Sequence, residues 1–382
     1  MKWVGTWTTA PVALDGIVLS NQTIRMIAHV SIGGSRLRVR LSNAFGLQKL
    51  AIGSAHVAVR DKEAAIVAGT DRVLTFNGQP STIIAVGAPV VSDPVDLDVP
   101  PLVDLAISVH LPADLPESFR LTGHGNARQT SYISPPGDFT SANEMPVQEA
   151  TQAWLFATGV EMEAPDEANG VVAFGDSLTD GNISTVDANQ RWPNQLARRL
   201  VKRSNERLVS VMNQGIGGNR ILHDVRGESG QRRFDRDVLG QPGVTHAIVL
   251  LGINDIRNRN QDPDEVVTAQ QMIGGLNQLA LRARARGVKI YGGTLLTFEN
   301  ETFNPGFYSP EGEAKRQAVN AWIRDGGAFD AVIDFEKGLR DPGHPTRMLP
   351  EYDCGDHLHP SDAGYRHMGD IIDLGLFDQA QY

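Results

Sequence analysis

The sequence predicts a chain of two parts, an antiparallel β-sandwich followed by an α/β part built on a parallel sheet. Residues 20–160 alternate between apolar and polar side chains with a period of two, which is typical of strands with one buried face. After residue 164, apolar runs alternate with stretches at helical spacing, which favours parallel strands covered by helices. Residues 165–170 lie between them as a run rich in turn residues. We therefore expect one domain at residues 1–164 and a second at residues 165–382, which agrees with a prior of about 150 residues per domain.

The strands expected in the first half are short and separated by Gly, Pro, Asp and Asn. Residues 23–30 and 36–41 show the clearest alternation, and similar runs follow at residues 55–59, 82–86 and 103–110. Short strands with frequent turn residues between them are typical of sandwiches. No long helix is expected here.

Three tryptophans accompany these strands, Trp3, Trp7 and Trp154. Their rings are able to stack on sugars, but large aromatic side chains between strands more often fill the core. We expect the core position for all three.

The second half contains five apolar runs that we expect to be parallel strands, at residues 171–174, 208–212, 247–251, 290–296 and 332–335. Helical spacing appears between them, for example at Leu196 and Leu200. Ser309 followed by Pro310 resembles a helix N-cap with proline at the first helical position. In open sheets of this type, functional residues gather at the carboxyl ends of the strands.

Composition narrows the classes of function. The net charge is −10, which argues against a nucleic-acid partner, because phosphate binding needs a basic surface. No apolar run of about 18 residues is present, so no integral membrane segment is expected. The first residues show no signal peptide, which makes the cytoplasm the expected location unless a leader has been removed. Cys354 is the single cysteine, so no disulfide forms within the chain.

Polar blocks follow four of the five expected strands. Residues 174–181 contain Ser177 directly after the first strand, where the chain must turn. Residues 213–219 follow the second strand and 252–255 follow the third. Residues 356–360 follow the fifth, just before a helix expected to bury Tyr365, Met368 and Ile372. If the strands are parallel, these blocks meet at one edge of the sheet.

The residue types in these blocks are those that acyl transfer needs. A serine hydroxyl becomes a nucleophile when a base takes its proton, and a histidine titrates near neutral pH. We expect Ser177 to be the nucleophile, His359 the base and Asp356 the residue that orients the base. The Ser177 N–H, the Gly218 N–H and the Asn254 side-chain amide are the expected donors to the oxyanion of the tetrahedral intermediate.

In this order the four blocks resemble those of the SGNH, or GDSL-type, esterases and lipases, over roughly residues 170–375. Ser177 matches the nucleophile in Gly-Asp-Ser-Leu, Gly218 the glycine of the second block and Asn254 the asparagine of the third. Asp356 and His359 match the Asp-x-x-His pair. Gly217 stands beside Gly218, so the sequence does not decide which of the two glycines supplies the second oxyanion donor. The resemblance implies a flavodoxin-like parallel sheet, no cofactor and no metal.

The first half resembles the jelly-roll-like modules that precede the catalytic domain in some carbohydrate-acting members of that family. The resulting functional prediction is a serine esterase that hydrolyses short-chain carboxylic esters, with acetyl esters of a small molecule or a glycan as substrates. Two alternatives remain open. The same residues suit a thioesterase, a lysophospholipase or a general lipase, and an inert hydrolase half would suit a glycan-binding protein. The sequence gives no indication of the oligomeric state.

Two further segments have competing interpretations. Residues 353–359 contain enough Asp, Cys and His for a metal site, but these residues are crowded and no matching cluster occurs elsewhere in the sequence. We interpret His357 as a solvated or supporting residue and Cys354 as a packed thiol. Residues 219–237 contain five arginines mixed with acids, which predicts a solvated face with local ion pairs, or else a wall of the active-site cleft.

Overall fold

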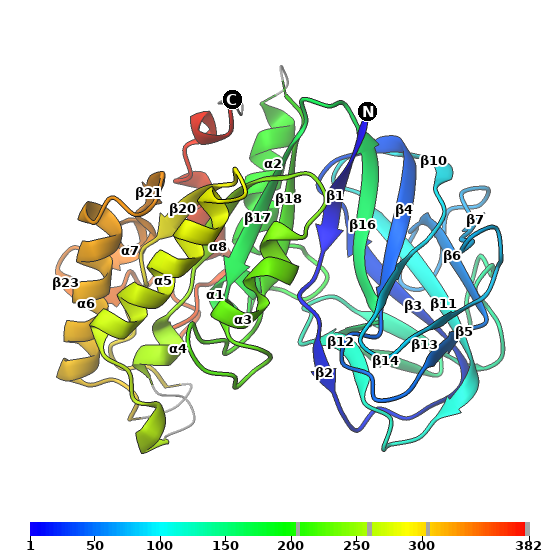
Figure 1. The fold of residues 1–382 in the computed structure, drawn as a ribbon, viewed down its shortest axis with the longest axis horizontal. Helices are drawn as coiled ribbons and strands as arrows, with labels where there is room; N and C mark the ends of the chain where they lie inside the picture. The colour runs from blue at the N-terminus through cyan, green and yellow to red at the C-terminus, as the bar shows by residue number, and fades with distance from the viewer. Residues whose placement is uncertain (204–206, 258–261, 303–305, 379–382) are drawn as a thin grey trace. The chain divides into compact units, whose positions relative to one another are not determined.

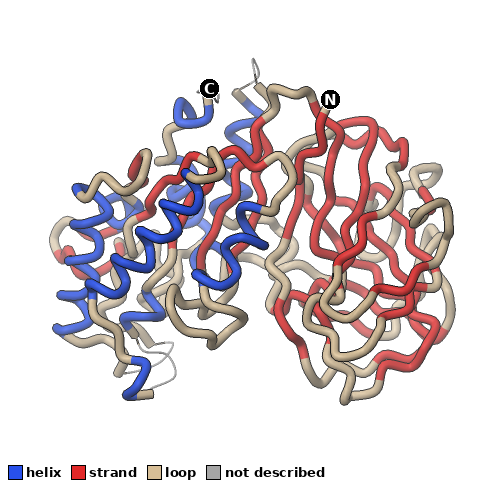
Figure 2. The backbone as a smooth tube through the Cα atoms, viewed as in Figure 1, coloured by secondary structure: helices blue, strands red, loops and turns tan. Residues whose placement is uncertain are grey.

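The computed structural model describes residues 1–203, 207–257, 262–302 and 306–378. The chain forms two compact units, Met1–Ala168 and Asn169–Tyr382, which divide four residues after the expected boundary. Figure 2 shows strands and loops in the N-terminal unit, and the helices in the C-terminal unit. Residues 1–168 are all described and contain no helix.

The N-terminal unit consists of antiparallel sheets. One has the path β1-β16-β4-β10 with β9 beside β4, and a second has the order β14-β13-β3-β11-β6-β7; the smaller sheets are β15-β12-β2 and β5-β8. The strands are β1 (Lys2–Thr8), β2 (Val12–Leu14), β3 (Leu19–His29), β4 (Gly34–Ser42), β5 (Leu50–Ile52), β6 (Ser54–Val59), β7 (Arg72–Val73), β8 (Thr82–Ile84), β9 (Pro89–Val91), β10 (Val95–Val99), β11 (Asp104–Leu115), β12 (Leu121–Gly125), β13 (Ser131–Pro136), β14 (Glu149–Thr151), β15 (Ala153–Leu155) and β16 (Ala157–Ala164). The prediction of a strand-rich, antiparallel first half is confirmed.

Side chains from the two larger sheets share one core. Val39 of β4 and Ile107 of β11 are both fully buried in the same cluster. Trp7 and Trp154 belong to it as well, with their rings edge to face at 5.1 Å. Trp3 differs, because it is half-buried and the Arg38 guanidinium lies 4.4 Å from its ring centre. The core position is therefore confirmed for Trp7 and Trp154 and wrong for Trp3.

The C-terminal unit alternates strands and helices along most of its length (Figure 1). Its strands are β17 (Asn169–Gly175), β18 (Val209–Gly215), β19 (Val244–Leu250), β20 (Lys289–Gly293), β21 (Ala331–Ile333), β22 (Arg340–Asp341) and β23 (His344–Met348). Its helices are α1 (Ser177–Asp180), α2 (Trp192–Lys202), α3 (Gly230–Phe234), α4 (Ile253–Ile256), α5 (Ala269–Arg284), α6 (Pro310–Asp325), α7 (Phe335–Leu339) and α8 (Asp362–Asp370), with a π-helix η1 (Asp235–Leu239) and 3₁₀ helices η2 (Pro263–Glu265) and η3 (Leu374–Phe377).

Five of these strands form one parallel sheet in the order β18-β17-β19-β20-β21. Every residue of β17 is buried, so both faces of the central strand are covered. Helices α2, α7 and α8 pack in one group and α3, α5 and α6 in another. The predicted flavodoxin-like α/β fold is thereby confirmed, and the carboxyl ends of β17, β18 and β19 lie side by side.

The ends of β20 and β21 fall short of the predicted runs. The Thr294 hydroxyl donates to Asp334, and the Leu295 N–H donates to the Asn320 side chain of α6. These contacts take the chain out of the sheet after Gly293. Asp334 in turn caps α7, so Phe335 begins a helix rather than ending a strand.

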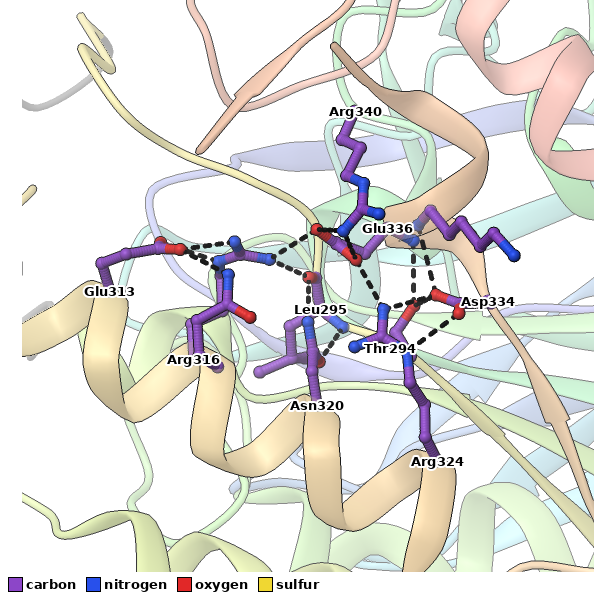
Figure 3. Close-up of polar contacts among 11 residues, drawn as sticks. Thr294, Leu295, Glu313, Arg316, Asn320, Arg324, Asp334, Glu336 and Arg340 are labelled. Carbon is purple, nitrogen blue, oxygen red and sulfur yellow. Dashed lines mark hydrogen bonds and ion pairs between the residues drawn. The ribbon is translucent and has the colours of Figure 1, made fainter. Parts of the chain in front are cut away.

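A network of charged residues anchors α6 beside these strand ends (Figure 3). Glu336 is 1% exposed and lies 2.5 Å from Arg324, 3.3 Å from Arg340 and 3.7 Å from Arg316. Arg316 is itself fully buried and donates to the Leu295 carbonyl. The network links α6, α7 and the loop that follows β20.

No helix among the described residues is long and apolar enough to cross a membrane.

Candidate active site

Ser177 stands at the first position of a short helix directly after β17. Asp176 is the N-cap, and its side chain accepts the N–H of Leu178. Gly175 is required before this turn, because a Cβ there would lie 2.4 Å from the Leu250 carbonyl oxygen. The strand therefore ends in a sharp turn that places the Ser177 hydroxyl at the carboxyl edge of the sheet, with only 6% of the residue exposed.

Three of the predicted residues form a continuous hydrogen-bonded chain. The Ser177 Oγ lies 2.9 Å from His359 Nε2, and His359 Nδ1 lies 2.7 Å from Asp356 Oδ2. A carboxylate beside Nδ1 places the ring proton there, so Nε2 is left to accept the serine proton. Ser177 and His359 are 182 residues apart in sequence, and the fold brings them together.

The loop before α8 presents His359 through a local turn. Asp356 Oδ1 accepts the backbone N–H groups of Leu358 and His359, at 2.9 and 2.7 Å. His357, between them, adopts a left-handed φ of 61°. Its ring points to Asp353 at 2.6 Å and is largely exposed. The turn therefore gives the two histidines different surroundings, and His359 is the one that faces Ser177.

Asp356 is held in its charged form. Burial raises the pKa of this carboxyl, but the hydrogen bond and the charge of His359, together with two backbone N–H groups, outweigh burial and hold the pKa well below its ordinary value. A permanent carboxylate at Nδ1 keeps the imidazole oriented toward Ser177.

The loop after β18 resolves which of two glycines has a free N–H. Gly217 donates its N–H to Asp180 Oδ2 at 3.2 Å. Gly218 has a φ of 79°, in the left-handed region that favours glycine. Among the described residues no acceptor contacts the Gly218 N–H, and none contacts the Ser177 N–H. Both groups are therefore available to a ligand.

Asn254 lies in α4, directly after β19, and is 1% exposed. Its Nδ2 donates to the Asn219 carbonyl at 3.1 Å, which uses one of the two amide hydrogens. The second hydrogen remains for another acceptor. Asn219 follows Gly218 directly, so this bond ties the loop after β18 to the end of β19.

Two buried carboxyls lie beneath the site. Burial raises the pKa of Asp176 to about 7, with the charge of Asp255 adding to the increase. Burial also raises the pKa of Asp255 to about 6, against the hydrogen bonds that it accepts from the N–H groups of Ile221 and Leu222. Asp255 thereby fixes the loop that carries Gly218.

Arg233 is a supporting residue that the sequence analysis did not single out. It is fully buried and donates to the Gly175 and Gln214 carbonyls, at 2.8 Å each, and to Asn219 Oδ1 at 3.0 Å. One side chain thus joins the ends of β17 and β18. The sequence signal was the Arg-rich segment, for which we expected a solvated face or else a wall of the cleft. The solvated face is wrong for Arg220 and Arg233, which are fully buried.

Asp353, Cys354 and Asp356 place one potential ligand atom each within 4.8 Å of one another, and they are the one such group among the described residues. However, the carboxylates are already engaged. Asp353 accepts the N–H groups of Gly355 and His357, and Asp356 holds His359. Burial raises the pKa of the Cys354 thiol to about 12, which makes it a poor ligand and a poor nucleophile. The donor set does not fit a metal without dismantling the turn.

A serine, a histidine and an aspartate linked in this way at the carboxyl edge of a parallel sheet have the arrangement that serine-type hydrolases use. The model of the GDSL-like Lipase/Acylhydrolase family matches residues 173–367, just over half of the chain. The chain belongs to this family and is a hydrolase of the esterase and lipase type.

Solved structures to which the chain is similar include three enzymes. A GDSL-like lipase from Bacteroides thetaiotaomicron VPI-5482 is 17% identical, with a TM-score of 0.41 over 55% of this chain and 87% of that one. A variant of an acetyl xylan esterase from Geobacillus stearothermophilus is 18% identical, with a TM-score of 0.40 over 52% and 90%. An alpha/beta hydrolase enzyme from the metagenome of Lake Arreo, Spain, is 17% identical, with a TM-score of 0.40 over 53% and 92%. No curated protein matches the chain.

Proposed function

We propose that this protein is a serine esterase that hydrolyses short-chain carboxylic esters through an acyl-enzyme on Ser177. The observation that carries the proposal is the hydrogen-bonded chain from Ser177 through His359 to Asp356, at 2.9 and 2.7 Å. Both distances are those of a nucleophile bonded to its base and of a base bonded to its orienting group.

In the first half-reaction His359 Nε2 takes the proton of Ser177 as Oγ forms a bond to the ester carbonyl carbon. The carbonyl oxygen becomes an oxyanion, which the Ser177 N–H, the Gly218 N–H and the second amide hydrogen of Asn254 are proposed to bind. The intermediate then expels the alcohol, which takes the proton from His359. The acyl group remains on Ser177 as an ester.

In the second half-reaction a water molecule gives a proton to His359 and attacks the acyl-enzyme. The second intermediate expels Ser177 Oγ, which recovers its proton from His359, and the carboxylic acid leaves. Asp356 stabilises the imidazolium in both steps without taking a proton itself. No cofactor enters either step.

We propose a short acyl group, with acetyl as the first candidate. Ser177 is 6% exposed and His359 only 1%, so little of the proposed nucleophile and base meets solvent, and we take this burial to favour a small acyl group. We further propose that the ester belongs to a small molecule or a glycan, and that residues 1–168 are a carbohydrate-associated domain. A thioesterase, lysophospholipase or lipase would use the same residues on a longer chain.

The test is the hydrolysis of p-nitrophenyl esters from acetate to palmitate by the unmodified protein and by Ser177→Ala. We expect the highest kcat/KM with acetate and no turnover by the variant, with unchanged circular dichroism. Full activity of Ser177→Ala would overturn the proposed mechanism, and an optimum on long chains would favour the lipase alternative. Acetate release from acetylated glycans then tests the glycan substrate, and glycan binding without turnover of any ester would favour an inert binding protein.

A further inference from the structure

Behind Asn254 lies a buried ion pair that the proposed chemistry does not use. Arg257 directs Nε and Nη2 at the two oxygens of Glu301, with N–O distances of 2.7 to 2.9 Å. The side chains of Arg257 and Glu301 are 1% and 0% exposed. The remaining guanidinium nitrogen, Nη1, donates to Asn254 Oδ1 at 3.1 Å. Arg257 therefore connects the carboxylate of Glu301 to the amide of Asn254.

The amide of an asparagine has two orientations of nearly equal shape, and they have opposite consequences in an oxyanion hole. One orientation presents N–H to the developing negative charge, and the other presents the carbonyl oxygen, which repels it. Arg257 has donors alone, so it requires Oδ1 on its side. The Asn219 carbonyl accepts alone, so it requires Nδ2 on the opposite side. Both contacts select the same orientation of Asn254.

Glu301 gives Arg257 its fixed position. A buried guanidinium without a partner is costly, and the two-point contact with a carboxylate holds the plane of the guanidinium as well as its charge. The ring of Phe307 lies over the same guanidinium, with its centre 5.1 Å from Cζ. Arg257 thus has little freedom to leave the Asn254 oxygen.

We infer that Arg257, held by Glu301, is a positioning residue that fixes the Asn254 amide with its free hydrogen toward the oxyanion. The inference rests on the proposed function and names a residue pair on which the speed of that reaction depends. Arg257 acts through Asn254 and not on the substrate. Its removal should therefore lower kcat more than it raises KM, because the lost interaction is made in the transition state.

A double-mutant cycle tests this dependence with p-nitrophenyl acetate. We expect Asn254→Ala to lower kcat by about 10²–10³-fold and Arg257→Met to lower it by at least about tenfold, with KM changed by less than about threefold. The double variant should be no slower than Asn254→Ala within about threefold, because without the amide there is nothing to position. Unchanged kcat in Arg257→Met, or losses that multiply in the double variant, would overturn the inference.

Two further variants separate positioning from a general loss of structure. Arg257→Lys keeps the charge but is unable to contact both Glu301 oxygens and Asn254 at once, so kcat should recover in part. Arg38→Met breaks a partly exposed ion pair with Glu161 in the N-terminal unit and should leave kcat unchanged. If Arg257→Met does not fold, Glu301→Gln replaces it in the same cycle, with a smaller loss of kcat that must vanish in the Asn254→Ala background. Ser177→Ala tests the proposed mechanism separately from the role of Arg257, because the mechanism requires Ser177 whether or not Arg257 positions Asn254.

Discussion

The Asp180 carboxylate accepts the backbone N–H of Gly217, with a distance of 3.2 Å between Oδ2 and the nitrogen. This bond occupies the donor of the first of two adjacent glycines. The next N–H in the chain, that of Gly218, has no acceptor among the described residues. The sequence did not decide between Gly217 and Gly218 as the oxyanion donor. The contact with Asp180 favours Gly218 in this proposed role.

Replacing Asp356 by Asn is expected to lower kcat by about 10³–10⁴-fold. An amide is able to donate to Nδ1, which would place the ring proton on Nε2 and leave no acceptor for the proton of Ser177. Steady-state rates with p-nitrophenyl acetate measure the effect. Asp325→Asn, which changes an exposed carboxyl of α6, is the control and should stay within about threefold of the unmodified protein. Equal losses in both variants would contradict the role given to Asp356.

Stability should fall as the pH rises through the titration of Asp176. Burial raises the pKa of this carboxyl from 3.8 to about 7, so between these values the folded state binds more protons than the unfolded state. The contribution is fully present below about pH 4 and lost above about pH 7. At 1.36 kcal/mol per pKa unit, its upper limit is about 4 kcal/mol.

The measurement is urea unfolding of the unmodified protein and of Asp176→Asn at pH 5 and pH 8, followed by helical circular dichroism. The unmodified protein should lose more free energy of unfolding between the two pH values than Asp176→Asn does. Asp325→Asn, an exposed carboxyl of the same unit, serves as the control and should follow the unmodified protein. Parallel pH dependence of the unmodified protein and Asp176→Asn would contradict the prediction.

Removing the charge of Glu336 is expected to destabilise the C-terminal unit by about 3–5 kcal/mol, because three arginines then lose a buried partner. Urea unfolding of Glu336→Gln measures this loss. The control is Glu311→Gln in α6, which removes the ion pair between the exposed Glu311 and Lys315. This change should lower the free energy of unfolding by less than about 1 kcal/mol. Similar losses for the two variants would show that the network in Figure 3 contributes no more than a surface pair.

Treatment with EDTA should leave kcat with p-nitrophenyl acetate unchanged. The carboxylates of Asp353 and Asp356 already accept hydrogen bonds from the turn that presents His359, and a cation would have to displace them. Rates are compared before dialysis, after dialysis against EDTA, and after addition of Zn²⁺. A loss of activity that Zn²⁺ restores would reinstate the metal interpretation of residues 353–359.

The sequence predicts most of the parallel sheet, because the length and spacing of apolar runs depend directly on which residues are buried. The five apolar runs all became strands of the parallel sheet, and Ser177, Gly218 and Asn254 follow three of them. Strand ends were less predictable. The chain leaves β20 after Gly293, because Thr294 and Leu295 bond to Asp334 and Asn320, which lie 40 and 25 residues further along the chain.

Sequence patterns did not predict the buried charged residues that support the site. Arg257 and Glu301 are 44 residues apart, and neither stands in a motif that marks it as buried. Charged residues are ordinarily exposed, so composition alone assigned Arg233 to the surface as well. Their burial depends on carbonyl groups and on an amide that become neighbours when β17, β18 and β19 align.

The order of the site residues along the chain has a consequence for synthesis. Ser177, Gly218 and Asn254 follow the first three strands of the sheet, whereas the turn that presents His359 comes after β21 and the β22–β23 pair. A growing chain therefore contains the proposed nucleophile and the proposed amide donors before it contains the proposed base. Under the proposed mechanism, Ser177 gains its base only when that turn has been synthesised, so the serine of a partly made chain should be inert toward esters.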